Sequence, residues 1–257
     1  MGKIAQVLLV NSVRQLTILR LTALFIAFLQ SFPASAGVVK ASDYESFWIW
    51  GGVKPQPFLS RARSLYILQG QVIEKRRQNK SETVVIAQGV PVAHLRKGEV
   101  WLVYRADTLR WKPEIIDALV SRLRLWQLSG NPVVGLQIDF DVKTRHLHEY
   151  VVFLRQLRAR LPTEYQLGIT GLLDWSTNGD IEAINRLKNV VDEVTVQTYQ
   201  GRKTIANCYD YLPALRRLTL PFKIGLVQNG EWKAPEDLES NPLFRGYVIF
   251  LQNQARR

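Results

Sequence analysis

Short hydrophobic runs alternate with longer helix-period segments from about residue 46 onward. The runs are rich in β-branched and aromatic residues, and in the segments between them apolar residues recur every three or four positions. This alternation is typical of a parallel sheet with crossover helices, and the nearly continuous apolar character of the runs suits strands covered on both faces. The predicted strands span residues 47–50, 64–68, 100–104, 133–139, 166–171, 193–198, 222–227 and 246–251.

The helix-period segments place their apolar residues on one stripe. In residues 113–128 the stripe contains Ile116, Leu119 and Leu123, and residues 147–161 repeat the pattern. Pro113 suits a first helical turn, and the run Gly130-Asn131-Pro132 ends the first helix sharply. Residues 181–187 and 209–218 are predicted to form two shorter helices.

Eight strands with alternating helices predict a compact (β/α)8 TIM-type barrel. One part departs from the alternation, because residues 71–98 have the pattern of a β-hairpin with a charged tip and not that of a helix. We therefore expect an irregular barrel with a hairpin insertion after the second strand. The alternative is an open doubly wound sheet, but no Gly-rich phosphate-binding turn follows the first strand.

The first 36 residues have the features of an export signal. They contain no Asp or Glu, an apolar run spans residues 21–29, and Ala34-Ser35-Ala36 provides the small residues that a signal peptidase requires. A retained membrane anchor is the alternative, but the run is shorter than the roughly 20 residues that a spanning helix needs. We expect cleavage after Ala36, a single domain over residues 37–257, a periplasmic or secreted location, and no stable membrane span after cleavage.

Charge and cysteine content restrict the class of protein. The chain of 257 residues is 47% hydrophobic and 22% charged, which fits a folded protein with a sizeable core. Cys208 is the single cysteine, so an internal disulfide is excluded. The leader holds three of the 34 basic residues and none of the 22 acidic ones, so its removal leaves a net charge of +9. This charge favours anionic surroundings such as envelope polymers, whereas the scattered basic residues and the lack of a binding motif argue against nucleic acid.

Three polar residues share one face of the fourth predicted strand. Gln137, Asp139 and Asp141 alternate with apolar neighbours and are expected to point inward at the carboxyl end, where TIM barrels hold their working groups. Two close carboxylates resist ionising together, so one should have a raised pKa, as a general acid requires. The structural alternative is that Asp139 and Asp141 cap the next helix or bind loop amides.

A metal site on these carboxylates is a further alternative. No histidine falls at a predicted strand end to complete it, and His146 and His148 are two positions apart in a predicted helix, so they face different directions. We therefore predict neither a metal nor a cofactor.

Aromatic, amide and charged residues recur at the other strand ends and are expected around the same mouth. Such a concave face suits a sugar, whose ring stacks on aromatic side chains while its hydroxyls form hydrogen bonds. The expected members besides Gln137 are Trp50, Arg105, Asp107, Asp174, Trp175, Gln197, Tyr199, Gln228, Trp232 and Gln252.

Residues 134–141 resemble the motif D-G-x-D-x-D-x-E on the fourth barrel strand of the chitinase-like glycoside hydrolases of family 18. Gly135 and Asp139 match, Gln137 replaces an Asp, and Asp141 stands at the position of the catalytic Glu. Residues 196–200 are similar to that family's M-x-Y-D, which implies that Tyr199 contacts the reacting sugar.

The chain after the leader also resembles, over nearly its whole length, a bacterial family called the domain of unknown function family 3142. The resemblance rests on residues 47–50, on Gln137-Ile138-Asp139-Phe140-Asp141 and on residues 170–175. It implies a barrel related to sugar hydrolases and brings no established activity.

The leading functional hypothesis is a glycoside hydrolase-like enzyme acting on an envelope or extracellular glycan. In it, Asp141 protonates the glycosidic oxygen, Asp139 orients Asp141 and stabilises positive charge, and Tyr199 positions the substrate. Because the two carboxyls are two positions apart on one strand, substrate-assisted hydrolysis through an acetamido group fits better than the ordinary retaining pair. The alternative is a catalytically inactive barrel that binds polysaccharide or a protein partner, which the departures at Gln137 and Asp141 favour.

Overall fold

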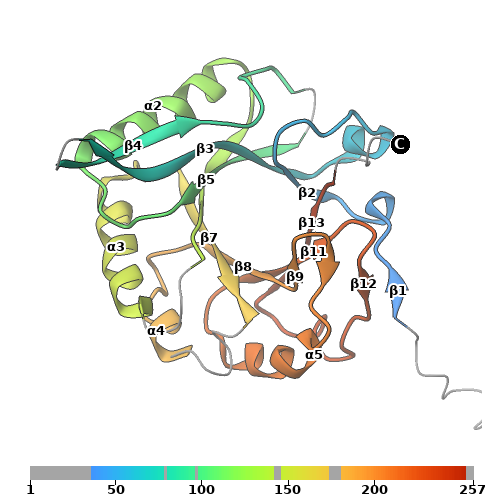
Figure 1. Cartoon of the computed structure of the whole chain (residues 1–257). Helices are drawn as coiled ribbons and strands as arrows, with labels where there is room; N and C mark the ends of the chain where they lie inside the picture. The colour runs from blue at the N-terminus through green and yellow to red at the C-terminus, as the bar shows by residue number, and fades with distance from the viewer. Residues whose placement is uncertain (1–35, 78–79, 96–97, 142–145, 174–180, 253–257) are drawn as a thin grey trace, which may run out of the picture. The chain divides into compact units, whose positions relative to one another are not determined.

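A closed barrel of eight parallel strands forms the centre of the protein (Figure 1). The computed structural model describes residues 36–77, 80–95, 98–141, 146–173 and 181–252. Within them the largest sheet has the strand order β2-β13-β11-β8-β7-β6-β5-β3-β4, and a further pairing of β2 with β3 closes the barrel. The barrel strands are β2 (Ser46–Ile49), β3 (Ser64–Arg77), β5 (Glu99–Ala106), β6 (Val133–Asp139), β7 (Gln166–Leu172), β8 (Glu193–Gln197), β11 (Phe222–Val227) and β13 (Phe244–Phe250).

This topology confirms the predicted TIM-type barrel and excludes the open doubly wound sheet. Two of the predicted strands, 133–139 and 222–227, have the observed bounds, and the others differ by a few residues at their ends, except for the second. The second strand continues to Arg77 because its later half pairs with an antiparallel neighbour.

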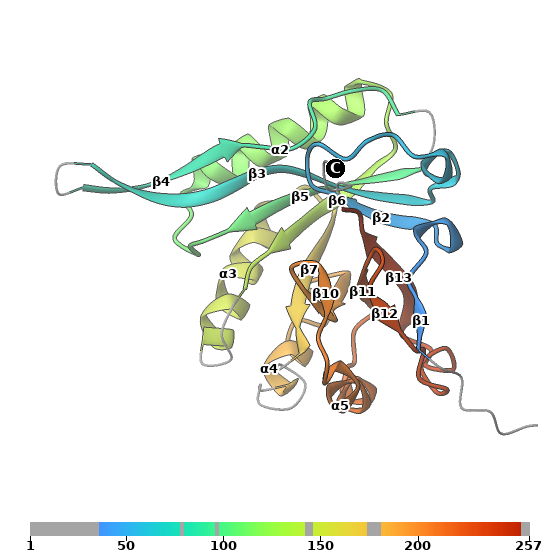
Figure 2. The same ribbon diagram turned by 45° about the vertical axis from the view of Figure 1, so that its right-hand side comes forward.

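That neighbour, β4 (Lys80–Ala87), confirms the predicted hairpin. Figure 2 shows β3 and β4 extending together past the barrel wall. The hairpin takes the place of the crossover helix that would otherwise follow the second barrel strand, so the barrel is irregular on this unit as expected.

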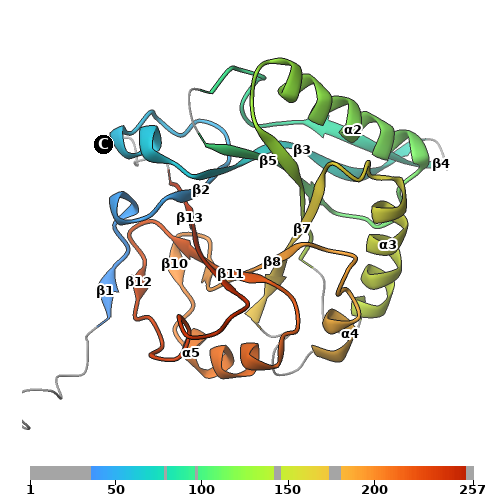
Figure 3. The same ribbon diagram turned by 180° about the vertical axis from the view of Figure 1, so that it is seen from behind.

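The helices follow the middle and later strands and cover part of the barrel wall (Figures 1 and 3). They are α2 (Pro113–Leu128), α3 (Leu147–Arg160), α4 (Ile181–Asn185) and α5 (Cys208–Tyr211). Short 3-10 helices span Ala41–Asp43, Pro57–Arg61 and Leu212–Arg217. Among the described residues, no helix combines the length and the apolar character needed to cross a bilayer.

The helix expected over residues 209–218 is divided. Helix α5 ends at Tyr211, and a 3-10 helix continues over Leu212–Arg217. Pro213 explains the change, because proline lacks an amide proton and its ring clashes with the carbonyl four residues before it in an α-helix.

In the described part of the chain, four short strands lie outside the barrel sheet. They form two antiparallel pairs, β1 with β12 and β9 with β10. Their bounds are β1 (Gly37–Val38), β9 (Tyr199–Gln200), β10 (Lys203–Thr204) and β12 (Glu231–Trp232). The pair β9–β10 directly follows β8, so it adds a small ribbon at the carboxyl end of that strand.

Side chains alternate between two hydrophobic layers along the barrel strands. On β5, Leu102 and Tyr104 belong to the outer layer with the helices, whereas Trp101 and Val103 belong to an inner cluster with Trp48, Tyr66 and Val248. The strand thus buries both faces, as its continuous apolar run predicts. The same alternation on β6 sends Leu136 and Ile138 outward and leaves the polar residues of this strand inside.

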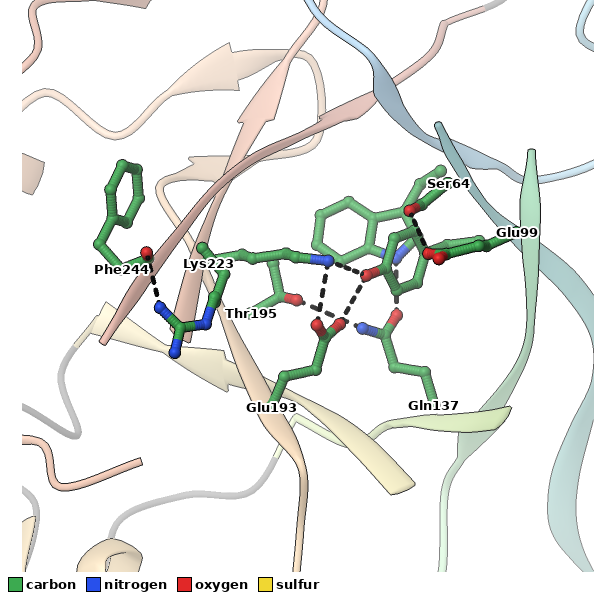
Figure 4. Close-up of polar contacts among 10 residues, drawn as sticks. Ser64, Glu99, Gln137, Glu193, Thr195, Lys223 and Phe244 are labelled. Carbon is green, nitrogen blue, oxygen red and sulfur yellow. Dashed lines mark hydrogen bonds and ion pairs between the residues drawn. The ribbon is translucent and has the colours of Figure 1, made fainter. Parts of the chain in front are cut away.

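The amino ends of the strands hold a buried polar network (Figure 4). Lys223 on β11 forms an ion pair with Glu193 on β8 at 3.0 Å, and the Tyr66 hydroxyl on β3 donates a hydrogen bond to Glu193 at 2.5 Å. The Lys223 ammonium also donates to the Tyr66 hydroxyl at 2.6 Å. The network therefore links three strands at the end that generally serves stability in TIM barrels.

Candidate functional site

A cavity of about 450 Å³ opens where the barrel strands end. Its lining comes from the carboxyl ends of six barrel strands and from the β9–β10 ribbon, so residues far apart in the sequence meet there. The lining residues are Trp50, Arg105, Asp139, Asp141, Leu172, Gln197, Tyr199, Gln200, Gly201, Ile205 and Phe250. This is the face at which TIM barrels carry out their chemistry.

Asp139, the last residue of β6, is a buried carboxyl at the base of this cavity. Only 3% of its surface is exposed, and the Thr170 hydroxyl on the neighbouring strand β7 donates a hydrogen bond to its Oδ1 at 2.7 Å. Burial raises the pKa of Asp139 from 3.8 to about 6, and the charge of Asp141 adds to the increase. The Thr170 hydrogen bond and Arg105 act in the opposite direction. Asp139 therefore exchanges a proton near neutral pH.

Asp141 lies two residues further along and is exposed. Its Oδ2 is 3.4 Å from a guanidinium nitrogen of Arg105, and the two side chains are 57% and 45% exposed. Arg105 comes from β5, where it is paired in register with Asp139. The three ionisable groups therefore form one cluster, with one carboxyl buried and the other at the surface of the cavity.

Aromatic rings form one side of the cavity. Phe250 stacks on Tyr199 with ring centroids 5.5 Å apart, and Trp50 meets Phe250 edge-on at 5.4 Å. The indole nitrogen of Trp50 is buried and has no hydrogen-bond partner among the described residues. This side of the cavity therefore offers apolar ring surface, which suits the apolar face of a ligand.

Tyr199 is within electrostatic range of both carboxyls. Burial raises its pKa well above 10, and Asp139 and Asp141 raise it further. The phenol therefore keeps its proton at ordinary pH and acts as a hydrogen-bond donor and not as a base.

Gln137 lies below the cavity and does not line it. The side chain is fully buried, its amide oxygen accepts a hydrogen bond from the Trp48 indole at 2.7 Å, and its amide nitrogen donates to Thr195 at 3.3 Å. Figure 4 shows its amide group directed to the barrel interior. The predicted inward direction is observed, but a substrate in the cavity would meet Asp139 before it met Gln137.

Several other predicted mouth residues do not line the cavity. Asp107 accepts two hydrogen bonds from Gln71 on the hairpin side, each at 2.9 Å. Gln228 accepts one from the backbone of Gln252 at 3.1 Å. Trp232 is on β12 and stacks on Tyr209. Asp174 and Trp175 lie outside the described residues.

Sequence reasoning missed Phe250, Leu172 and the ribbon residues Gln200, Gly201 and Ile205. Phe250 and Leu172 are the last residues of β13 and β7, each within one residue of a predicted strand end, so the rule that selected Trp50 also applies to them. Thr170 was missed as the partner of Asp139, although the register of two adjacent parallel strands contains the signal. Ile138 pairs with Ile169, so the next residues, Asp139 and Thr170, are neighbours.

Metal ligands are not clustered in the part of the chain that the structure describes. It contains no group of three or more His, Cys, Asp and Glu side chains that could hold an ion. His146 forms an ion pair with Glu149 at 3.3 Å and His148 is exposed on α3. The neighbours of the two carboxyls in the cavity are Arg105 and aromatic side chains.

A second cavity, of about 470 Å³, lies between the 3-10 helix Leu212–Arg217 and residues 233–241. It is apolar inside, and Arg216 and Asp237 form an ion pair at its rim. It has no buried carboxyl and does not lie at the strand ends. The cavity at the carboxyl end is the stronger candidate because it combines a buried carboxyl with a raised pKa, a cation and aromatic surface.

Comparisons with known proteins found one similar solved structure to report and one family match over part of the chain. The structure is similar to the crystal structure of the Bacillus cereus spore cortex-lytic enzyme SleL, with 17% identity, a TM-score of 0.45, and coverage of 71% of this chain. The chain spans 50% of the length of that protein, so the conclusions on function rest on the geometry of the site. No curated protein matches the chain in sequence. The family described as a domain of unknown function (DUF3142) matches residues 106–217, which contain the Gln137–Asp141 segment, Thr170 and Tyr199 but not the aromatic residues 47–50.

Proposed function

We propose that this protein is a glycoside hydrolase-like enzyme that acts on a glycan outside the cytoplasm. The observation that carries the proposal is the pair Asp139 and Asp141 at the carboxyl end of a closed barrel, one carboxyl buried and protonatable, the other exposed, beside aromatic rings. Glycosidic bonds are cleaved by two carboxyl groups with different protonation states, and sugars bind to aromatic surfaces. The location rests on the export signal predicted from the first 36 residues of the sequence.

Asp141 is the proposed proton donor to the glycosidic oxygen. A general acid must come within hydrogen-bond distance of the leaving oxygen, and Asp141 is the carboxyl that extends into the open part of the cavity. Arg105 holds it on the side of β5 until substrate enters. Release from this contact is then the first step of the reaction.

Asp139 is the proposed partner that holds the reacting group in place. Its pKa of about 6 means that it carries a proton for part of the time near neutral pH. The ionised form stabilises the positive charge that develops at the sugar ring, and the protonated form donates a hydrogen bond to Asp141 or to the substrate. Tyr199, whose phenol keeps its proton, donates a hydrogen bond that positions the substrate.

Substrate-assisted hydrolysis of an N-acetylated glycan fits this arrangement best. Asp139 ends β6 and Asp141 lies two residues beyond it, so both carboxyls approach the sugar from one side, whereas an ordinary retaining pair flanks the bond. A nucleophile supplied by the 2-acetamido group of the substrate removes the need for a second carboxylate on the opposite face.

Hydrolysis of N-acetylglucosamine oligosaccharides by the wild type and by Asp141→Asn tests the proposal. We expect a loss of at least a hundredfold in kcat/KM for Asp141→Asn, which is the usual contribution of a general acid. Asp117→Asn, which changes an exposed carboxyl on α2, is the matched control and should retain full activity. Turnover that survives in Asp141→Asn would remove this residue from the role of acid.

A catalytically inactive carbohydrate-binding barrel is the second candidate. One reason is that Asp141, the proposed acid, is already in contact with Arg105. The other is that Asp has a shorter side chain than the Glu found at this position in the family 18 motif, so it would lie further from the substrate. In that case the oligosaccharides bind without turnover, and Asp141→Asn leaves the affinity nearly unchanged.

A further inference from the structure

Arg105 is the one charged residue among the described lining residues to which the proposed chemistry gives no direct role. On β5 it follows Trp101 and Val103, whose side chains fill the barrel interior, so Arg105 continues the inward-facing row at the point where the interior opens. Its register partner on β6 is Asp139. A cation is therefore fixed at the rim by a buried strand, on the same side as both carboxyls.

The ion pair of Arg105 with Asp141 is a weak one. A single guanidinium nitrogen contacts one carboxylate oxygen at 3.4 Å, and both side chains are about half exposed. Exposed pairs of this kind contribute little to stability, and arginine prefers to bind a carboxylate with two parallel N–H groups. Arg105 has five N–H donors, so most of its hydrogen-bonding capacity remains open to a ligand.

Arg105 is also the single cationic side chain among the described residues that line the cavity. The remaining lining groups are two carboxyls, two amides, and apolar or aromatic side chains. A neutral sugar gives an arginine no charged partner, whereas a sugar with a carboxylate pairs with it in bidentate fashion. The sequence as a whole carries a net charge of +12, which attracts anionic polymers toward the protein.

We infer that the glycan bound in this cavity bears a carboxylate, and that Arg105 recognises this group in place of its contact with Asp141. The inference rests on the proposed function, since it names the substrate class of the same site. Two kinds of sugar supply this chemistry, namely a uronic acid with the carboxylate on the ring and an amino sugar with an ether-linked lactyl group. Displacement of Arg105 from Asp141 also frees the proposed acid, so the charged substituent prepares the site for reaction.

The affinity of the cavity for an acidic glycan should depend on pH through Asp139. The charged groups that act on Asp139 are Asp141, two residues after the end of β6, and Arg105 on β5. The phenols of Tyr150 and Tyr199 also lie in its range, and Asp139 raises their pKa values. Below pH 6 Asp139 is mostly protonated, so an incoming carboxylate meets one negative charge fewer. The affinity for an acidic glycan therefore rises as the pH falls from 7 to 5. The affinity for a neutral glycan lacks this increase, because a neutral ligand is not repelled by the charge of Asp139.

Four tetrasaccharides separate the possibilities in a binding measurement by calorimetry at pH 5 and 7. They are the N-acetylglucosamine tetramer, the alternating N-acetylglucosamine and N-acetylmuramic acid tetramer, the methyl ester of the latter, and the alternating glucuronic acid and N-acetylglucosamine tetramer. The first two have the same β-1,4 linked N-acetylated backbone and differ in the lactyl carboxylate. The ester removes the charge and keeps the size, and the fourth places the charge on the ring.

The variants are Arg105→Gln, Arg105→Lys and, as a matched control, Arg245→Gln, which removes an exposed arginine near the start of β13 at the other end of the barrel. We expect the wild type and Arg245→Gln to bind one acidic tetramer at least tenfold more tightly than the neutral tetramer and the ester, which corresponds to one charge-assisted hydrogen-bonded pair. Arg105→Gln should lose this preference and keep the affinity for the neutral tetramer, and Arg105→Lys should keep part of the preference. Circular dichroism checks that each variant is folded.

Equal affinities for acidic and neutral tetramers in the wild type, unchanged in Arg105→Gln, would overturn the inference and leave the proposed carbohydrate site in place. An acidic preference that persists in Arg105→Gln would assign it to another cation and overturn the role of Arg105. Failure of all four tetramers to bind would contradict both the inference and the proposed function.

Discussion

Two aspartates two positions apart have different environments in this protein. Alternation along the strand predicted that Asp139 and Asp141 face the same side, and they do. It did not predict that Asp139 is buried while Asp141 is exposed, because that difference depends on where β6 ends and on Thr170 from another strand. Residue spacing therefore locates the pair, whereas the protonation of each member depends on contacts between strands.

Thr170 is expected to lower the pKa of Asp139, because its hydroxyl donates to the ionised carboxylate more strongly than to the neutral acid. Thr170→Val, which keeps the shape and removes the hydroxyl, should raise the pKa of Asp139 above its present value of about 6. Carbon-13 NMR titration of labelled aspartate measures this change. Thr170→Ser keeps the donor and should titrate as the wild type does, and an unchanged value in Thr170→Val would show that the hydrogen bond has no influence.

The buried carboxyl of Asp139 also links stability to pH. Its pKa is about 6 in the folded protein against an ordinary value of 3.8, so the folded state binds the proton more tightly and loses stability as the pH rises from about 4 to about 6. The shift of about two units corresponds to about 3 kcal/mol. Asp139→Asn removes the titration, so the difference in unfolding free energy between wild type and variant should decrease by about this amount across the interval. A difference that is constant with pH, measured by urea denaturation, would contradict the assigned environment.

At the scale of elements, the strands were the most predictable part of the fold. Their apolar runs are long and continuous because both faces are buried, and the hairpin β3–β4 was visible in its alternating pattern. The helix expected over residues 209–218 is divided into α5 and a 3-10 helix, because Pro213 does not fit the interior of an α-helix. The small ribbon β9–β10 was not predicted, since two-residue strands leave no periodicity, and this is why Gln200 and Ile205 were missed.

The strands β3, β8 and β11 are joined at their amino ends by Tyr66, Glu193 and Lys223. Lys223→Met should destabilise the protein by about 3–5 kcal/mol, because it leaves the buried Glu193 carboxylate without its counter-charge. The double variant Lys223→Met with Glu193→Gln removes both charges and should lose less than the single variant. Urea denaturation of both variants measures their losses in unfolding free energy. Equal losses would mean that the unpaired charge of Glu193 is not the cause of the destabilisation.

At the scale of the whole barrel, the interior is closely packed. The interior is filled by large aromatic side chains, and Gly225 on β11 leaves room for Trp48, since a β-carbon at this glycine would lie 2.7 Å from the indole ring. Gly225→Ala should therefore destabilise the barrel by about 1–3 kcal/mol through overpacking. Gly37→Ala is the control, as nothing lies within 4 Å of its β-carbon position. Equal thermal stability of the two variants would contradict the close packing of the interior.

The location of the site at the carboxyl end follows from the barrel topology and could be predicted once the eight strands were recognised. The closed interior places Gln137 out of reach of a ligand, which a strand-by-strand reading could not show, because the depth of a side chain depends on how neighbouring strands are staggered.

The central claim is that the cavity around Asp139, Asp141 and the aromatic rings binds a glycan for reaction. A crystal structure of Asp141→Asn with an N-acetylglucosamine tetramer tests it most directly, because the substitution removes the proposed acid and keeps the shape of the cavity. In this crystal structure we expect a sugar ring beside Trp50 and Phe250, with a glycosidic oxygen within hydrogen-bond distance of the side chain at position 141. A glycan bound only between residues 212–217 and 233–241, or absent from the protein at saturating concentration, would contradict it.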